Sequence, residues 1–378
     1  MYHRRNILLG SMAAALAVSW RSASAADTVK LGAVIPTTGP LAEAGRYALQ
    51  GATLAVDEAN RAGGVSGRPV ELVIEDDQST NPGTVLAFNK LISDPEITAI
   101  LGPTRSTQIG AIAPDILKAG KPVMIGGTDP RLTQAGNPWL FRCRPNDIYT
   151  ARVIAAFGLE TLGKRKWAIV HSTDAFGTSA SQLLIDALAK QGVTPVLRQG
   201  QPNNSLDFTP VALAVRQSGA DIVSSFITFE TDLAVFARQL RQLGVNLPWI
   251  GSPSITTTTA LKLAGAALYG TFGVADFHRD ANPEAREFAQ AYQAKYGTAP
   301  DFFGAWPYDA TRILTLALSQ GGGGEPQQIR DALLSLRGYR GVEGTYGFDR
   351  NGDGLHSYNI VKNVDGTVVL DRHIEFDD

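Results

Sequence analysis

Short apolar segments rich in β-branched residues alternate with helical patterns along most of this chain, and this alternation limits the folds open to it. The first series has strand patterns at residues 29–36, 70–75, 98–101 and 122–125. The second has them at residues 167–170, 193–197, 221–225 and 248–251. Because crossover helices cover both faces of a parallel sheet, the pattern predicts an α/β protein with two doubly wound lobes, each built on a parallel sheet.

The last third of the chain follows a different pattern. Helical patterns occupy residues 284–296, 305–319 and 326–336. Residues 344–370 are typical of antiparallel strands, with turns at Asn351–Gly352 and Asp365–Gly366. A length of 378 residues, 44% of them hydrophobic, is sufficient for two cores.

The charge balance argues against nucleic acid as a partner. Lys and Arg number 34 against 36 Asp and Glu, for a net charge of -2. Such a chain has no strong field that would attract phosphates.

Residues 1–25 have the pattern of an export signal. Basic Arg4 and Arg5 precede an apolar run that ends near Val18, and a small-residue cleavage site precedes Ala26. Whether Arg4 and Arg5 mark the twin-arginine route or are ordinary basic residues of the general secretory route stays open. Cys143 is the single cysteine, which excludes an intramolecular disulfide and argues against a lipid anchor at the start of the mature chain. We expect a mature protein in the periplasm.

Motifs for catalysis or metal binding are incomplete. The five histidines form no close ligand pair, and no nucleophile elbow occurs. Residues 349–354 imitate the start of a calcium loop, but Ile360 stands at the position of the bidentate Glu, so a polar turn is the better interpretation. Residues 75–77 are acidic and end a strand, where acids more commonly cap a turn than catalyse. No cofactor, metal site or catalytic residue is predicted, and the chain is not expected to be an enzyme.

Several short motifs occur together in a specific order. They are Lys30–Ala33, Thr38–Ala42, Asp57–Asn60, Gly63–Gly67, Glu75–Asp77, Leu101–Pro103, Ser106–Gln108, Phe141–Arg142, Asn146–Asp147 and Tyr308–Ala310. With them the chain resembles the leucine/isoleucine/valine-binding proteins of bacterial ABC importers over essentially its whole mature length. The resemblance implies two lobes joined by a three-segment hinge, with residues 26–147 and 276–354 in one lobe and residues 148–275 and 355–378 in the other.

A ligand is expected between the lobes, at the carboxyl ends of the strands. The loop before the helix at Ser106 offers free N–H groups and hydroxyls that suit an anion, although a plain N-cap explains Ser106 as well. The resemblance implies that the ligand carboxylate is bound near Thr104 or Ser106 and by Gly126, Gly127 and Thr128. Aromatic positions of the family correspond to Phe176 and Phe229. Two neighbouring positions complete the candidate set, Arg105 in the first loop and Ser252 after the strand that ends at Gly251.

The chain departs from the family at the ammonium half of the site. Where the family has a Glu, residues 251–254 contain no acid, and a cleft Tyr is replaced by Ala44. Unless Glu230, Asp129 or Asp276 substitutes, the ligand is expected to be an aromatic or aliphatic acid without an α-ammonium group. The expected partners are this small carboxylate and an inner-membrane ABC permease, and the protein is expected to be a monomer. Two alternatives are a receptor for amides or urea-like solutes and an enzyme built on the same lobes.

Overall fold

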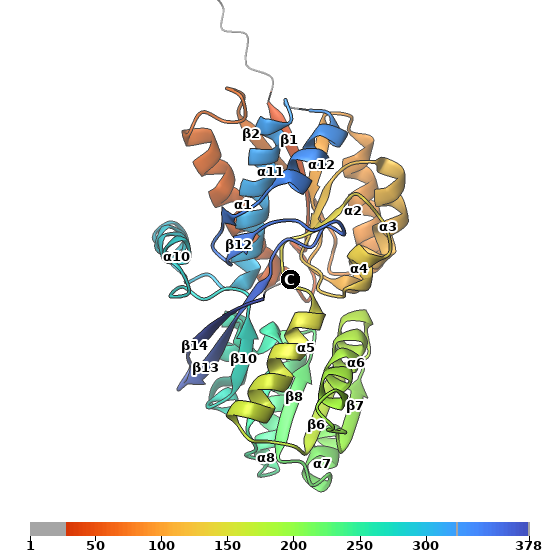
Figure 1. The fold of residues 1–378 in the computed structure, drawn as a ribbon, viewed down its shortest axis with the longest axis vertical. Helices are drawn as coiled ribbons and strands as arrows, with labels where there is room; N and C mark the ends of the chain where they lie inside the picture. Colours follow the sequence, from red (N-terminus) through yellow and green to blue (C-terminus); the bar gives the residue numbers. More distant parts are fainter. Residues whose placement is uncertain (1–27, 323, 377–378) are drawn as a thin grey trace, which may run out of the picture.

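The computed structural model describes residues 28–322 and 324–376. Two α/β lobes are stacked end to end (Figure 1). One combines the orange N-terminal part of the chain with blue C-terminal helices, and the other contains the yellow and green middle part. The predicted fold class is confirmed, whereas the proposed signal at residues 1–25 lies outside the described residues. No helix in the described part is long and apolar enough to span a bilayer.

The first lobe has a parallel five-stranded sheet in the order β2-β1-β3-β4-β5. Apolar cores lie on both of its faces, as a sheet covered by helices requires. Its strands are β1 (Val29–Ile35), β2 (Val70–Asp76), β3 (Ile97–Leu101), β4 (Val123–Ile125) and β5 (Leu140–Arg142). The helices between them are α1 (Ala42–Arg61), α2 (Asn81–Ser93), α3 (Ser106–Ala119) and the short α4 (Arg131–Gln134).

The second lobe has a seven-stranded sheet in the order β14-β13-β10-β9-β8-β6-β7. Its strands are β6 (Trp167–Ser172), β7 (Leu197–Gln201), β8 (Ile222–Phe226), β9 (Trp249–Gly251), β10 (Phe272–Ala275), β13 (Ser357–Val364) and β14 (Thr367–Glu375). The last two are antiparallel and join through the predicted turn at Asp365–Gly366. The helical segments are α5 (Asp147–Ala156) with a π-helical end η1 (Phe157–Thr161), α6 (Ala175–Ala189), α7 (Thr209–Gln217), α8 (Glu230–Gln242), η2 (Pro253–Thr256), α9 (Thr258–Ala264) and η3 (Gly265–Leu268).

Three further helices return to the first lobe. They are α10 (Pro283–Tyr296), α11 (Phe302–Gln320) and α12 (Pro326–Ser335), and their apolar faces join the core formed by α1 and β1. A small ladder of β11 (Tyr339–Arg340) and β12 (Thr345–Tyr346) follows. Within residues 28–376 the chain passes between the sheets after β5, after β10 and before β13. These passages support our proposal of lobe boundaries at residues 147/148, 275/276 and 354/355.

Two local predictions need correction. The strand predicted at residues 193–197 is wrong, because β7 spans Leu197–Gln201. This edge strand is polar and only half-buried, so its position follows from pairing with β6 and not from an apolar run. The turn at Asn351–Gly352 does not join two regular strands. It closes a polar loop in which Asp349 accepts hydrogen bonds from the N–H groups of Asn351 and Asp353.

Candidate functional site

A cavity lies between the two lobes, at the carboxyl ends of the strands of both sheets. The first lobe contributes residues of the β1–α1 loop, α1, α3 and α11, and the second contributes loops that follow β6, β8 and β9. The lining residues are Pro36, Leu41, Ala44, Gly45, Ala48, Thr104, Arg105, Ser106, Thr107, Gln108, Thr128, Arg144, Asp174, Phe176, Thr228, Pro253, Ser254, Phe302 and Phe303.

The N-terminus of α3 presents free donors to this cavity. Arg105, and not Ser106, is the N-cap residue, and no side chain caps the helix. The N-cap interpretation of Ser106 is therefore wrong; its hydroxyl accepts a hydrogen bond from the N–H of Asp129 at 3.3 Å. The N–H groups of residues 106–108 have no partner within the described part of the chain, as expected for a first helical turn. Uncapped N–H groups and the positive end of the helix dipole favour an anion here.

Arg105, the N-cap residue of α3, is one of the residues that line the cavity. It stacks on the Phe229 ring of the other lobe, with Cζ 4.0 Å from the ring centroid. Its Nε is buried without a hydrogen-bond partner, and the guanidinium forms no ion pair with any residue that the structure describes. Burial lowers the pKa of Arg105, while the carboxylate of Glu230 opposes this most strongly. A guanidinium always carries its charge in proteins, so this donor fork is available to an anion.

Other charges around the cavity are already engaged. Arg144 lines the cavity but forms an ion pair with Asp276. Asp174 is the single acid in the lining set, and its carboxylate accepts hydrogen bonds from the N–H of Gly177 at 2.9 Å and from the amide of Asn203 at 2.8 Å. Arg105 is therefore the one charged group of the lining set without an ion-pair or hydrogen-bond partner.

The three acids considered as ammonium partners do not line the cavity. Asp129 forms an ion pair with Arg131, and Asp276 forms one with Arg144. Glu230 is buried at the start of α8, next to Phe229. Burial raises the pKa of Glu230 to about 7, and Arg105 lowers it by electrostatic attraction.

The acidic strand end at residues 75–77 caps a turn. Asp76 accepts hydrogen bonds from the N–H groups of Thr37, Thr38 and Gln78. Asp77 accepts one from the N–H of Ser79 at 2.7 Å. These carboxylates do not line the cavity.

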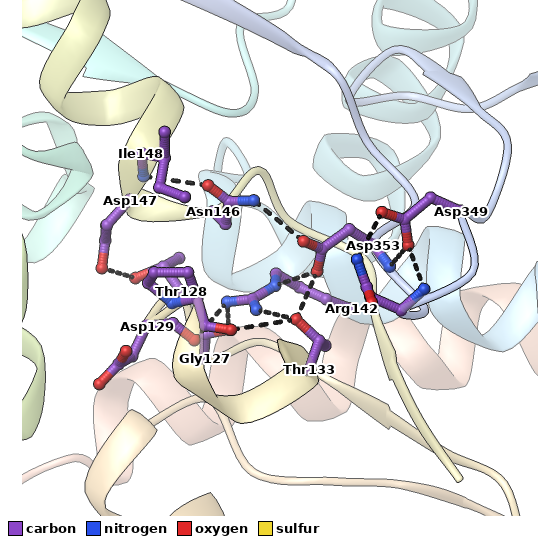
Figure 2. A network of polar contacts seen from close by, with 12 residues as sticks. Gly127, Thr128, Asp129, Thr133, Arg142, Asn146, Asp147, Ile148, Asp349 and Asp353 are labelled. Carbon is purple, nitrogen blue, oxygen red and sulfur yellow. Dashed lines mark hydrogen bonds and ion pairs between the residues drawn. The ribbon is translucent and has the colours of Figure 1, made fainter. Parts of the chain in front are cut away.

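The loop after β4, residues 126–129, is held from behind (Figure 2). Arg142 donates to the carbonyls of Gly127 and Asp129 at 2.8 and 3.0 Å. The Thr128 hydroxyl donates to Asp147 at 2.9 Å, so the group that Thr128 can offer to a ligand is its backbone N–H. Burial raises the pKa of Asp147 to about 7.

The two glycines of this loop pack against other parts of the first lobe and do not line the cavity. A β-carbon on Gly126 would lie 2.8 Å from the Trp306 side chain, and one on Gly127 would lie 2.4 Å from the Ile109 side chain.

The remaining wall is apolar. Phe176 from α6 faces the cavity as predicted, together with Ala44, which is small enough to leave space. Phe229 and Ser252 are buried behind the lining residues, Phe229 in contact with Arg105 and Ser252 bonded through its N–H to the carbonyl of Ser225. Sequence reasoning missed Phe302 and Phe303, which precede the helix predicted at residues 305–319 and form the first turn of α11. It also missed Arg144, whose signal is a charged residue within a buried extended segment.

Comparisons with known proteins agree with the two-lobed fold described above. The family model described as periplasmic binding protein matches residues 28–367. The Leu/Ile/Val-binding protein homolog 8 of Brucella abortus is 31% identical over 353 residues, which cover 87% of this chain and 86% of that protein. A branched-chain amino acid transporter substrate binding protein from Streptococcus pneumoniae, solved with isoleucine, has a TM-score of 0.84 at 22% identity and covers 92% of this chain and 99% of its own. An ABC transporter solute binding protein from R. palustris, solved with benzoate, has a TM-score of 0.84 at 19% identity, with 92% and 96% covered.

Proposed function

This chain belongs to the periplasmic binding protein family, the solute-binding components of branched-chain amino acid-type ABC transporters rather than enzymes, and we propose that its ligand is a small carboxylic acid without an α-ammonium group. The acid has an aromatic or aliphatic body and is held in the interlobe cavity. In this proposal the protein works in the periplasm, after removal of residues 1–25, and delivers the acid to an inner-membrane permease.

One observation carries the proposal. The only unpaired charge in the cavity lining is the guanidinium of Arg105, and it lies at the free N-terminus of α3. A planar donor fork beside uncapped N–H groups can bind a carboxylate through two hydrogen bonds. An α-ammonium group would need a free carboxylate partner, because leaving that charge unpaired in a desolvated site is costly.

The body of the ligand is assigned to the apolar side of the cavity. Phe176, Phe302 and Phe303 offer ring faces, and Ala44 and Ala48 of α1 leave room beside them. Flat or branched apolar groups fill such space well.

A second candidate is an α-amino acid. Two observations favour it: Asp174 lines the cavity, and a relative from Pseudomonas aeruginosa is named as a leucine-, isoleucine-, valine-, threonine- and alanine-binding protein. In this case Asp174 would have to exchange its bond to Asn203 for one to the ligand ammonium.

Calorimetry with matched ligands separates the two candidates. Leucine and 4-methylpentanoate have the same apolar body and carboxylate and differ in the α-ammonium group, and benzoate adds an aromatic body. After unfolding and refolding to remove any resident ligand, we expect the two acids to bind tens-fold more tightly than leucine, a difference of about 2 kcal/mol. Submicromolar binding of leucine, with neither acid binding, would contradict the proposal and favour Asp174 as the ammonium partner.

The role of Arg105 is tested by Arg105→Met. The loss of hydrogen bonds to a charged group is expected to weaken acid binding at least tenfold. Arg286→Met is the matched control, because the Arg286 guanidinium is exposed and pairs with exposed Asp280 outside the cavity. An Arg105→Met protein that binds acids as tightly as the control would show that the carboxylate is bound elsewhere.

A further inference from the structure

Two arginines at alternate positions lie behind the loop formed by residues 126–129. Arg142 ends β5, and Arg144 follows two residues later in an extended segment, which places both side chains on the same side of the chain. Arg142 binds the carbonyls of Gly127 and Asp129, and Arg144 binds the carbonyl of Gly126 at 2.9 Å. Carbonyl oxygens that are turned toward cations do not repel an anion on the other side of the loop.

The same arginines reach the other two chain segments that pass between the lobes. Arg142 pairs with Asp353 at 2.8 Å, just before the third passage. Thr133 and Asn146 also donate to Asp353, both at 2.9 Å (Figure 2). Arg144 pairs with Asp276, which directly follows β10 at the second passage. The four charged side chains are nearly inaccessible, with at most 7% of any of them exposed.

The front of the loop faces the ligand cavity and the second lobe. Thr128 and Arg144 line the cavity, and the Arg144 guanidinium lies over the Phe302 ring at 4.2 Å. The Asp129 carboxylate accepts a hydrogen bond from the Ser179 hydroxyl of the other lobe at 3.3 Å. The loop thus contacts the cavity, all three connecting segments through the arginines, and the opposing lobe.

We infer that Arg142 and Arg144 are positioning residues that couple ligand binding to movement of the lobes. Resting on the proposed function, in which Arg105 and the N-terminus of α3 bind the carboxylate, this inference adds the N–H of Thr128 as a further donor to it, while the arginines fix the carbonyl side of the loop to the hinge segments. A ligand that orders the loop then also orders the segments about which the lobes rotate.

Paired substitutions test this inference without leaving a buried charge unpaired, which would itself cost several kcal/mol. One protein carries Arg144→Met with Asp276→Asn, and a second carries Arg142→Met with Asp353→Asn. Arg241→Met is the matched control, because Arg241 also donates to two carbonyls, those of Val245 and Ala267, but lies in the second lobe away from the cavity. Arg144→Lys retains the charge beside Asp276 and serves if a paired variant fails to fold.

The first measurement is hydrogen exchange without ligand. The amides of Gly126 and Asp129 donate to the Pro103 carbonyl and the Ser106 hydroxyl. We expect peptides that span residues 126–129 to exchange at least tenfold faster in the paired variants than in wild type or the Arg241→Met control. Unchanged exchange of these peptides would overturn the inference.

The second measurement is binding, with benzoate and leucine as probes because both carry a carboxylate. We expect the paired variants to lose at least tenfold in affinity, and to lose the compaction that X-ray scattering detects at saturating probe in wild type. Affinity within twofold of wild type, together with normal compaction, would contradict the coupling. If wild type binds neither probe, the proposed function fails, whereas the exchange experiment still decides whether the arginines position the loop.

Discussion

Glu230 is the carboxylate that most strongly offsets the charge of Arg105. Only 5% of its surface is exposed, and its Oε1 has no hydrogen-bond partner among the described residues. It lies directly after Phe229, on which Arg105 stacks. Its role in this arrangement is to compensate the guanidinium at a distance, which leaves the guanidinium N–H groups unoccupied.

The pKa of Glu230 gives a pH prediction. Burial raises this pKa to about 7, from an ordinary value of 4.5. Between these values the folded protein holds more protons than the unfolded chain, so this group lowers stability as the pH rises. Glu230→Gln removes the effect, and we expect the variant to gain stability relative to wild type as the pH is raised from about 5 to 8. Urea unfolding at both pH values measures the difference in stability between the variant and wild type. Glu160→Gln, at an exposed site, is the control. A stability difference between Glu230→Gln and wild type that is the same at both pH values would contradict the prediction.

Helices α1 and α11 cross closely, and together they form one wall of the cavity. Gly51 permits the approach: a β-carbon there would lie 2.0 Å from the carbonyl oxygen of Gly304. The backbone of a packed helix cannot yield cheaply, so the two helices would have to separate.

At the scale of these elements we predict opposite effects for one substitution at two sites. Gly51→Ala is expected to destabilise the protein by about 1–3 kcal/mol through overpacking, and to weaken ligand binding as the wall shifts. Gly110→Ala, at an exposed position in α3 with nothing within 4 Å of the added carbon, is expected to stabilise it by about 0.5–1 kcal/mol. The midpoints of denaturant unfolding measure both effects, provided that the dependence of the unfolding free energy on denaturant concentration is the same in all proteins. A harmless Gly51→Ala would mean that the helices are free to move apart.

The two lobes meet around the cavity through polar contacts and one stacked arginine. The contacts include hydrogen bonds of Ser179 with Asp129, of the N–H of Ala175 with Thr107 at 3.4 Å and of the N–H of Thr258 with Asp301 at 3.0 Å, and the Arg105 guanidinium over the Phe229 ring. Such contacts break with little repacking, unlike a buried apolar interface.

We therefore predict compaction on ligand binding, and a defined effect of removing one contact. Ser179→Ala is expected to weaken ligand affinity two- to tenfold, the range for one hydrogen bond of about 0.5–1.5 kcal/mol, mainly through faster dissociation. Ser218→Ala is the control, because its hydroxyl bonds within the second lobe to the Val215 carbonyl. Stopped-flow rates and scattering at saturating ligand measure both effects; an unchanged radius of gyration in wild type would contradict lobe closure.

Local sequence determined the architecture because burial on both faces of a parallel sheet demands continuous apolar strands, such as β3 and β8, and amphipathic helices between them. It also placed the loop before the helix at Ser106 at the interlobe cleft, since residues just after parallel strands converge at one edge of a sheet, whereas Thr128 and Phe176 came from the family resemblance. The polar edge strand β7 escaped prediction because its position depends on its neighbour.

Tertiary structure alone decided which charges remain free. The sequence offers Glu230, Asp129 and Asp276 as equivalent candidates for an ammonium partner, and nothing local distinguishes them. Folding pairs Arg144 with Asp276 and Asp129 with Arg131, and buries Glu230 behind the cavity wall. It also brings Phe302 to the cavity from a helix far along the chain. The electrostatics of a site depend on distances between such remote segments, and these distances exist only in the folded molecule.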